Sequence, residues 1–441
     1  MPGTLLAFDD TDAPEGMCTT YLAALIIEEL SEYDLLGLPR LVRLNPNIPW
    51  KTRGNAAICL TIGHGSGRSE PCGELSGRKI VCYERGRPAD PQDLLDRAVR
   101  VLRRVARFDC DQTNPGIVAS NRRPPPSVYW KAVRGIVRLA EVEAVLRQTG
   151  AVWRKFKKGR GVIGAAAAMS WRPRDRTWEV IAYRSPDRFG TPREIDPHSV
   201  IRMDKTTRMT FNNYDYDNGH VAICPGSPCP ILFGIRGDSA KELLRARKMI
   251  KGETQDKWLL FLTNQATEDH IVQRRISELR PMMSARVRAR VAAPPRTIVG
   301  GHVIVPIEDG ASIEVAFYEP SRSFREVARQ LLPGDEVVVY GSVRREPRSL
   351  NAEKLLILSL VEDRRKVRNP VCGSCGKSMG SLGRGKGFRC KVCGAKAGVD
   401  AATWRTVPRS VAPGWYEPPV ASRRHLHKPL RRMSRDELDK I

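Results

Sequence analysis

Apolar strand-like runs alternate with helical patterns along the first quarter of the chain. Residues 4–8 (TLLAF) form a short apolar run typical of a buried strand, and apolar side chains recur at helical spacing across 19–36. Two further strand-like runs, at 40–44 and 56–62, precede a second helical pattern at about 91–107. This order of strands and helices predicts an α/β domain at the N-terminal end of the chain.

The pattern in the middle of the chain is less regular. A Pro- and Arg-rich break at 121–126 indicates a domain boundary or a loop. The expected elements are a helical stretch over 127–150, a strand pair at 162–169 and 178–183, short strands and turns over 204–236, and a basic amphipathic helix at 238–251.

From about residue 284 to 362 the pattern changes to alternating strands. One helix, at about 322–332, interrupts them and is followed by a turn that ends at Asp335. Five strands with a helix between the third and the fourth are the plan of an OB-fold barrel, although another small β-barrel would give a similar pattern. The expected strands are Ala285–Val291, Gly301–Pro306, Ser312–Phe317, Glu336–Val343 and Lys354–Leu360.

Four of the eleven cysteines form two Cys-x2-Cys pairs, Cys372 with Cys375 and Cys390 with Cys393. Four thiolates at this spacing provide the tetrahedral shell that structural Zn²⁺ prefers. The other cysteines are scattered, which argues against a secreted disulfide framework. The pairs therefore predict a zinc ribbon, with an iron–sulfur cluster or a redox role as the alternative.

The charge of the chain suggests a partner. Lys and Arg number 74 against 49 Asp and Glu, a formal net charge of +25. Over half of this excess lies in 365–441, whereas residues 1–30 carry acids and neither Lys nor Arg. The excess favours nucleic acid as partner over a merely basic surface. No apolar run reaches the ~18–20 residues of a membrane span, and no signal peptide pattern is present, so we expect a soluble, cytoplasmic protein.

An acidic cluster follows the first apolar run. Asp9, Asp10 and Asp12 stand at the end of the expected strand, where carboxylates can hold Mg²⁺ and, through it, phosphates. The alternative is that they cap the helix that follows. Thr19 and Thr20 bring two hydroxyls to the start of that helix, where they can cap it or relay a phosphoryl group.

Cations and glycine turns complete a possible phosphate site. The segment from Lys51 to Asn55 and the turn from Thr113 to Gly116 supply charged side chains and exposed amides, so the set favours ATP-dependent phosphoryl transfer. The glycines of 159–164 match the G-x-G-x-x-G pattern. They follow a basic segment rather than a buried strand, so a dinucleotide fold is poorly supported.

Taken in order, these segments resemble the archaeal tRNA(Ile) 2-agmatinylcytidine synthetase family from residue 1 to about 400. The resemblance, with the strand and cysteine patterns, implies an α/β and α+β multidomain protein. The segments that carry it are Phe8–Asp12, Gly16–Tyr21, Pro39–Pro46, Lys51–Asn55 and Thr113–Gly116. The implied domains are a kinase-like catalytic domain at 1–126, a ferredoxin-like domain at 127–283, an OB-fold at 284–363, the zinc ribbon at 364–400 and a basic tail at 401–441.

The resemblance also implies a reaction. ATP activates the C2 carbonyl of the wobble cytidine of tRNA(Ile) with a CAU anticodon by phosphorylation, and agmatine displaces the activated oxygen, so that AUA is decoded. The implied cofactors are ATP, Mg²⁺ and Zn²⁺, the partners are tRNA and agmatine without a membrane, and a monomer is expected.

Individual residues take roles from the same resemblance. Asp9, Asp10 and Asp12 match metal-binding carboxylates, and Thr19 matches an autophosphorylated threonine, with Thr20 as the alternative. An acid is expected between the prolines of 226–230 and is missing. The expected phosphate contacts are Lys51, Arg53, Asn55, Asn114 and Gly116, and the candidate agmatine contacts are Gly161, Ser199, Asn212 and Asn213.

Two other functions fit parts of the chain. An OB-fold with a zinc ribbon also describes single-strand nucleic-acid-binding proteins without enzymatic activity, but this leaves the N-terminal motifs without a role. A kinase that acts on a small molecule uses those motifs, but the basic C-terminal third argues against it.

Overall fold

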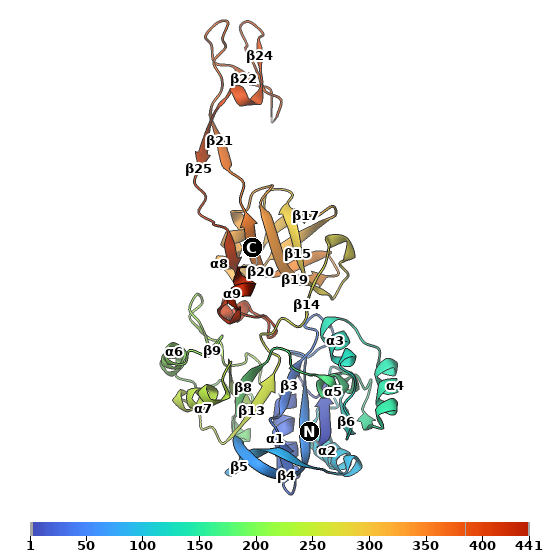
Figure 1. Ribbon diagram of the computed structural model, residues 1–441. Coiled ribbons are helices and arrows are strands. Elements are labelled where there is room, and N and C mark those ends of the chain that lie inside the picture. The colour runs from blue at the N-terminus through green and yellow to red at the C-terminus, as the bar shows by residue number, and fades with distance from the viewer. Residues whose placement is uncertain (1–2, 384, 440–441) are drawn as a thin grey trace.

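The structure is a computed structural model that describes residues 3–383 and 385–439. An α/β body holds the N-terminal two thirds of the chain, a β-barrel lies against it, and the ribbon is held away from both on a two-stranded arm (Figure 1). No helix in these described ranges combines the length and the apolarity needed to cross a membrane.

An eleven-stranded sheet forms the centre of the α/β body. The strand β1 (Thr4–Asp9) is the predicted apolar run and pairs antiparallel with its neighbours β4 and β6. The strands of this half are β2 (Asp34–Leu36), β3 (Arg40–Arg43), β4 (Ala56–Leu75), β5 (Arg78–Pro88), β6 (Gly116–Ser120) and β7 (Val152–Lys155).

Both faces of β1 are buried because helices cover both sides of the sheet. Leu6 and Phe8 pack with α1 (Thr19–Glu29) and α2 (Pro91–Val105) in one core. Leu5 and Ala7 face the opposite core. The helices of that second core are α3 (Ser127–Arg134), α4 (Leu139–Thr149) and α5 (Gly161–Ser170).

The prediction of a strand at 162–169 is wrong, because this segment forms the helix α5. Alanine is the strongest helix former, and four alanines stand in a row here. The helix is buried on all sides, so its sequence lacks the polar positions that reveal helical periodicity. The helical pattern at 19–36 is also shorter than expected, because α1 ends at Glu29 and the last residues form β2.

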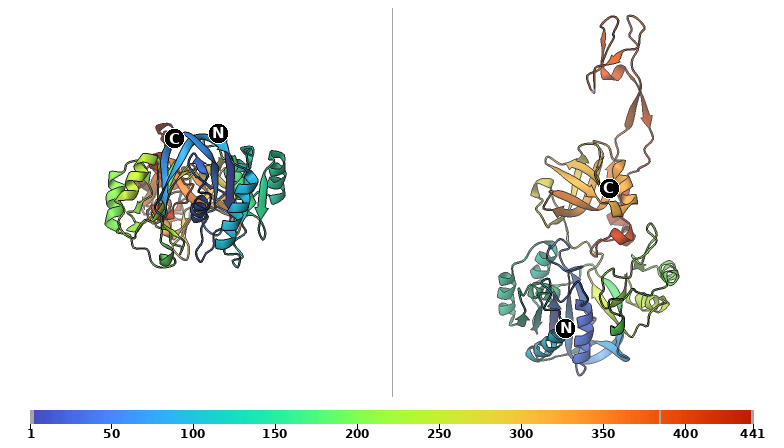
Figure 2. Two further views of the ribbon diagram at one scale, coloured as in Figure 1. Left: turned by 90° about the horizontal axis from the view of Figure 1, so that it is seen from below. Right: turned by 180° about the vertical axis from the view of Figure 1, so that it is seen from behind.

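The sheet continues into the middle of the chain through β13, which pairs with β3 and β4 on one side and with β8 on the other. Two helices cover this half at one side of the body (Figure 2). The elements are β8 (Thr177–Tyr183), α6 (Pro197–Thr206), β9 (Thr210–Phe211), β12 (Ile231–Gly237), α7 (Ala240–Met249) and β13 (Lys257–Thr263), with a small hairpin of β10 (Tyr214–Asp215) and β11 (His220–Val221).

The next strands form a closed five-stranded barrel, in which β15 pairs with both β19 and β17 and so completes the ring. The five predicted strands and the helix between the third and fourth are confirmed. They are β15 (Ser284–Val291), β17 (Val303–Glu308), β18 (Ser312–Phe317), α8 (Ser323–Arg329), β19 (Glu336–Arg344) and β20 (Ser349–Ser359), with the short β14 (Ile271–Gln273) and β16 (Arg296–Thr297) at the edges.

The chain leaves the barrel and later returns to it. The antiparallel arm of β21 (Asp363–Arg368) and β25 (Thr403–Val407) carries the ribbon. After the arm, β26 (Gly414–Tyr416) joins the barrel sheet beside β20, and the chain runs between the barrel and the α/β body to α9 (Arg435–Leu438) (Figure 1). The ribbon strands are β22 (Gly380–Ser381), β23 (Phe388–Arg389) and β24 (Lys396–Ala397).

Candidate active site

Two cavities meet beyond the end of β1. The acidic pocket, of about 240 Å³, contains Asp9, Asp10 and Asp12, and the arginine pocket, of about 420 Å³, contains Arg43 and Arg236. The two cavities share one wall, so a group carried by that wall faces both. The residues that line both are Asp12, Thr19, Arg53 and Ala56.

Cations compensate Asp9 and Asp10 of the acidic pocket only weakly, whereas Asp12 pairs with Arg53 at 3.1 Å. Burial raises the pKa of Asp9 well above its usual range, and the charges of Asp10 and Asp12 add to the shift. Burial also raises the pKa of Asp10 to about 6, although Arg160, 3.9 Å away, opposes the shift. No side chain among the described residues forms an ion pair with Asp9. Adjacent buried carboxylates without a cation are unfavourable when ionised, which is the environment that a divalent cation relieves.

The three aspartates do not form a closed metal cage, because their oxygens do not all lie within 4.8 Å of one another. Mg²⁺ generally uses only one or two carboxylates and completes its shell with phosphate oxygens and water. The donor set therefore fits a magnesium ion that is shared with a bound polyphosphate.

Glycines bring the start of α5 against these carboxylates. A Cβ atom at Gly164 would collide with the carboxylate of Asp9, and one at Gly161 would collide with the backbone of Asp9. The strand β6 approaches as closely, because a Cβ at Gly116 would strike the backbone of α5. The glycine pattern at 159–164 thus serves close packing of a helix N-terminus against Asp9.

The shared wall presents one hydroxyl to both cavities. The Thr19 hydroxyl donates to Asp12 Oδ1 at 2.9 Å and accepts a hydrogen bond from the Thr11 hydroxyl at 3.0 Å. Arg53 Nε lies 3.1 Å from the other oxygen of Asp12. Thr20 lines the arginine pocket but not the acidic pocket, and its hydroxyl lies 3.4 Å from the sulfur of Cys18.

The predicted phosphate contacts fall into two groups. Lys51, Arg53 and Asn55 line the acidic pocket. Asn114 and Gly116 line neither pocket, although Asn114 lies close by and its backbone N–H donates to the Asp10 carbonyl at 3.1 Å. Their roles as phosphate contacts remain predictions, and the structure shows Asn114 as a support for the backbone of the acidic cluster.

One side of the acidic pocket is apolar, and the sequence did not predict it. Trp50 and the connection between α3 and α4 give this side an apolar surface, and Arg160 lies over the Trp50 ring at 5.6 Å. An aromatic ring beside a phosphate site is suited to a nucleotide base. No local pattern marks the connecting segment, because its apolar side chains have no periodicity. Its lining residues are Gly135, Ile136, Val137 and Leu139.

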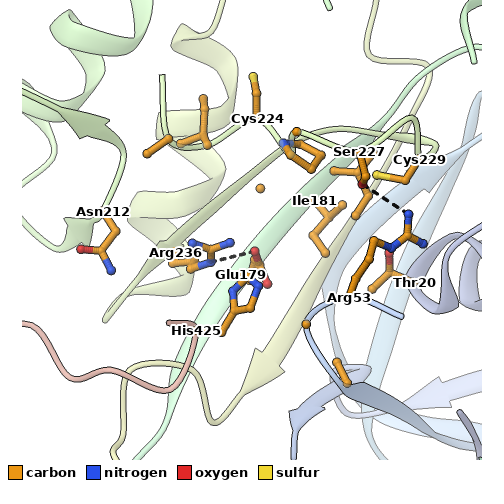
Figure 3. A pocket seen from close by; sticks show the side chains of 18 of the residues that line it. Thr20, Arg53, Glu179, Ile181, Asn212, Cys224, Ser227, Cys229, Arg236 and His425 are labelled. Carbon is orange, nitrogen blue, oxygen red and sulfur yellow. Dashed lines mark hydrogen bonds and ion pairs between the residues drawn. The ribbon is translucent and has the colours of Figure 1, made fainter. Parts of the chain in front are cut away.

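The arginine pocket is built around a buried carboxylate. Glu179 Oε1 lies 3.0 Å from Arg236 Nε (Figure 3). Glu179 Oε2 lies 3.9 Å from Arg43 and accepts a hydrogen bond from Gln265. Burial lowers the pKa of Arg43 to about 10, with Glu179 opposing the shift and Arg236 adding to it. Arg43 therefore stays charged at neutral pH, and two guanidinium groups face one carboxylate.

A single side chain organises the loop at 225–231 that forms another wall of this pocket. The Arg193 guanidinium donates hydrogen bonds to the carbonyls of Pro225, Ser227 and Ile231 at 2.8 Å and of Cys229 at 3.0 Å. Between the prolines, where an acid is expected, the loop has the buried Cys229. The nearby Ser227 hydroxyl lies 3.3 Å from Arg53 (Figure 3).

The candidate agmatine contacts are dispersed. Asn212 lines the arginine pocket, and its side-chain oxygen accepts from Arg423 at 2.8 Å. Asn213 is buried beside it and bonds Asp204 and Thr210. Ser199 lies in the first turn of α6, where its hydroxyl bonds the Asp196 carbonyl. Gly161 stands at the start of α5, as described above. Of the four, Asn212 alone lines the arginine pocket.

The four ribbon cysteines are gathered as predicted, with sulfur atoms all within 4.8 Å of one another. The backbone N–H groups of Cys393 and Val392 point at the Cys390 sulfur and lower its thiol pKa to about 6. Thiolates held in this way fit a tetrahedral Zn²⁺ site.

A mixed α/β body, a closed five-stranded barrel and a four-cysteine ribbon define a multidomain α/β protein with a metal-binding ribbon. Family models narrow this class. The TiaS TCKD domain model matches residues 5–158, the TiaS FLD domain model 159–270, and the TiaS C-terminal zinc ribbon domain model 369–411. The chain belongs to the TiaS family, that of the isoleucine tRNA 2-agmatinylcytidine synthetases.

The relatives cover nearly the whole chain. The synthetase of Methanocaldococcus jannaschii is 37% identical over 96% of this chain and 97% of its own, and that of Archaeoglobus fulgidus is 39% identical over 97% of each. The crystal structure of a TiaS complex with its isoleucine tRNA and ATP is 38% identical, with a TM-score of 0.84 over 99% of both chains. A TiaS complex with the tRNA, AMPCPP and agmatine is 35% identical, with a TM-score of 0.81 over 99% of both. The family resemblance is confirmed, and it extends past residue 400.

Proposed function

We propose that the protein uses ATP to replace the C2 oxygen of the wobble cytidine of tRNA(Ile) with agmatine. The observation that carries this proposal is the Thr19 hydroxyl in the wall between the two pockets. A phosphoryl donor on one side and an acceptor on the other can both reach this wall. The alternative of a nucleic-acid-binding protein without activity is not favoured, because it gives neither pocket a role.

The acidic pocket receives ATP. Trp50 and the apolar segment between α3 and α4 hold the base, and Lys51 and Arg53 contact the phosphates. Asp9 and Asp10, whose buried carboxylates cations compensate only weakly, would hold Mg²⁺ together with the phosphate oxygens. When bound, the metal neutralises charge that develops during phosphoryl transfer.

The arginine pocket receives the cytosine base and agmatine. A base in an anticodon loop must leave its stack to enter a pocket, and loop bases can be drawn out in this way. A phosphoryl group from ATP forms a bond to the C2 oxygen, while its P–O bond to the rest of the nucleotide breaks and that nucleotide leaves. The agmatine amine then forms the C2–N bond and loses a proton, the C2–O bond breaks, and phosphate leaves with that oxygen. Arg43 and Arg236 are placed to stabilise the phosphoryl oxygens.

The remaining domains grip the tRNA. We assign the barrel as an OB-fold, the N-terminal part as kinase-like and the middle part as ferredoxin-like. Basic side chains alternate outward along β15 of the barrel and suit contacts to phosphates. We also propose that the protein acts in the cytoplasm, because its substrate is a tRNA. The outward side chains of β15 are Arg286, Arg288 and Arg290.

The decisive experiment supplies the purified protein with unmodified tRNA(Ile) transcript bearing the CAU anticodon, ATP, Mg²⁺ and radiolabelled agmatine. Label should enter the tRNA only when both ATP and Mg²⁺ are present. The matched control is the same transcript with uridine at the wobble position, which should remain unlabelled. ATP turnover without incorporation would reject agmatine as the amine, and tight tRNA binding without ATP turnover would restore the non-enzymatic alternative.

A further inference from the structure

The segment that follows the ribbon has no role in the reaction as described so far. After β26, residues 417–433, named here the C-terminal strap, cross from the barrel to the α/β body (Figure 1). The strap thereby brings side chains from the end of the chain to the cavities that the first half builds.

Backbone and apolar contacts make the strap part of the folded α/β body. The carbonyls of His425 and Leu426 accept hydrogen bonds from the backbone N–H groups of Ala266 at 2.8 Å and Glu268 at 2.9 Å. Leu426 is buried in the core formed by α3, α4 and α5. Burial of Leu426 in this core fixes the position of the strap relative to the sheet.

Charged side chains hold the strap on both sides of this anchor. Arg432 pairs with Asp175 at 2.9 Å and with Asp238 at 2.8 Å, so it joins two loops of the α/β body. Arg424 lies 3.4 Å from Glu353 of the barrel and 2.5 Å from the side-chain oxygen of Asn47. The strap is therefore attached at several points rather than lying loosely over the surface.

The anchored strap forms a wall of the arginine pocket, to which it contributes residues between 420 and 425. The His425 imidazole lies beside Glu179 and Arg236 in the cavity (Figure 3). On its other side it packs against Gly54, where an added Cβ would come within 2.9 Å of Cδ2 and Nε2 of the ring.

The imidazole is uncommitted, whereas the carboxylates around it are already paired. Both oxygens of Glu179 have partners, and Asp12 is occupied by Thr19 and Arg53. The ring of His425 forms no hydrogen bond with any described residue. Burial, together with the charges of Arg43 and Arg236, holds the pKa of His425 well below its usual range, so the ring is neutral and one nitrogen can accept a hydrogen bond.

We propose that the strap completes the amine site of the arginine pocket and that the His425 imidazole accepts a hydrogen bond from the attacking amine of agmatine. The inference rests on the proposed function and adds to it a substrate-contacting residue from the far end of the chain.

The chemistry of the nucleophile favours this pairing. An alkylammonium ion has no free lone pair, so it must lose a proton before it can attack C2. The guanidinium groups of Arg43 and Arg236 disfavour a third cation beside them and thus favour the free amine. A neutral imidazole that accepts one N–H of this amine fixes the direction of the lone pair, which a protonated imidazole could not do.

The test compares kcat and KM for agmatine at saturating ATP and tRNA. His425→Phe fills the same space without an acceptor and should lower kcat/KM for agmatine by about tenfold or more. His425→Gln offers a carbonyl oxygen and should recover most of the loss. KM for ATP and tRNA affinity should not change. His198→Ala, at an exposed position of α6 outside both pockets, is the matched control.

A second pair of variants covers the case in which His425→Phe does not fold. Gly54→Ala places its new methyl group 2.5 Å from Arg43 Nη1 and 2.9 Å from the imidazole, and it should also lower kcat/KM for agmatine. If it acts by displacing His425, the double variant Gly54→Ala/His425→Gln should lose less than the product of the two single losses. Fully multiplicative losses would contradict the inference.

The failure of the inference is distinguishable from the failure of the proposed function. If the wild type incorporates agmatine and His425→Phe does so with unchanged kcat/KM, the inference is overturned and the proposed function stands. If the wild type incorporates no agmatine, the proposed function falls and the inference falls with it. Calorimetric binding of agmatine without tRNA gives an independent readout, in which equal affinity of the wild type and His425→Phe overturns the inference.

Discussion

The hydroxyl of Thr19 lies 2.9 Å from Asp12 Oδ1, and the backbone N–H of Thr19 lies 2.6 Å from the same oxygen. One carboxylate oxygen thus satisfies the first N–H of α1 and orients the hydroxyl that faces both pockets. Capping and phosphoryl chemistry, which stand as alternatives for the acidic cluster in the sequence, use the same residue in the structure.

This geometry separates the two threonines at the start of α1. Thr19→Val removes the shared hydroxyl but keeps the backbone N–H that Asp12 caps, so the helix should remain folded. We expect agmatine incorporation to fall at least about 10³-fold. Thr20→Val should retain most activity, because Thr20 lines the arginine pocket alone. Initial rates of agmatine incorporation check both variants. If Thr19→Val is active and Thr20→Val is inactive, the catalytic hydroxyl belongs to Thr20 and not to Thr19.

Arg193 offers a test of the loop that walls the arginine pocket. Its guanidinium reaches four backbone carbonyls, which a lysine ammonium with its single nitrogen cannot span. Arg193→Lys should raise KM for agmatine about tenfold and leave KM for ATP unchanged, because the loop borders one pocket only.

Arg188→Lys is the control for this change, since Arg188 forms an ion pair with Glu194 at the surface. Steady-state kinetics with agmatine and with ATP as the varied substrate distinguish the two pockets. An equal rise in both KM values would show that Arg193 supports the whole body rather than the loop.

Glu353 links the barrel to the strap and predicts a dependence of stability on pH. Burial alone would raise its pKa, but Arg424, His270 and His427 outweigh burial and lower the pKa to about 2. A carboxylate whose pKa is lower in the folded state stabilises the fold above its unfolded pKa and loses this contribution as the pH falls toward the folded pKa. The contribution is about 3 kcal/mol by linkage.

The measurement is the midpoint of thermal unfolding of the wild type and of Glu353→Gln between pH 7 and pH 3. The wild type should be the more stable at pH 7, and the difference should shrink as the pH falls below about 5. A difference that stays constant over this range would show that Glu353 acts by packing rather than by charge.

The ribbon predicts a separation of tRNA binding from ATP chemistry. Cys375→Ser removes one of four thiolates and should release Zn²⁺, because three ligands no longer close the tetrahedral shell. The ribbon lies on an arm away from both pockets, so tRNA affinity should fall while ATP binding remains (Figure 1). Zinc content by atomic absorption and tRNA binding by filter retention check this, with Cys110→Ser as a control outside the ribbon. Full zinc retention in Cys375→Ser would contradict the assignment.

Local sequence predicted the parts of the site that lie on short continuous segments. Asp9, Asp10, Asp12 and Thr19 come together because one strand end and one helix start bring them there. The ribbon cysteines are close because their spacing allows few other arrangements.

Long-range pairing decides the rest. Arg43 and Glu179 stand on different strands, and no local pattern indicates that they share a pocket. Ser199 and Asn213 carry suitable polar groups, but helix and turn hydrogen bonds use those groups locally, which a residue type alone does not reveal. The helix α5 escaped prediction because a fully buried helix shows no periodicity.

Because the strap lies near the C-terminus, the ribosome makes it long after the α/β body against which it packs. Ribosomes add roughly 5–20 residues per second, so the strap emerges roughly 20–80 s after β1. During this interval the nascent α/β body can form its acidic pocket, but it lacks Leu426 in its core and one wall of its second cavity. A chain whose translation stops in the ribbon would thus be left with an exposed apolar slot and an unfinished amine site, so the polypeptide is both vulnerable and inert until its last segment folds back onto its first.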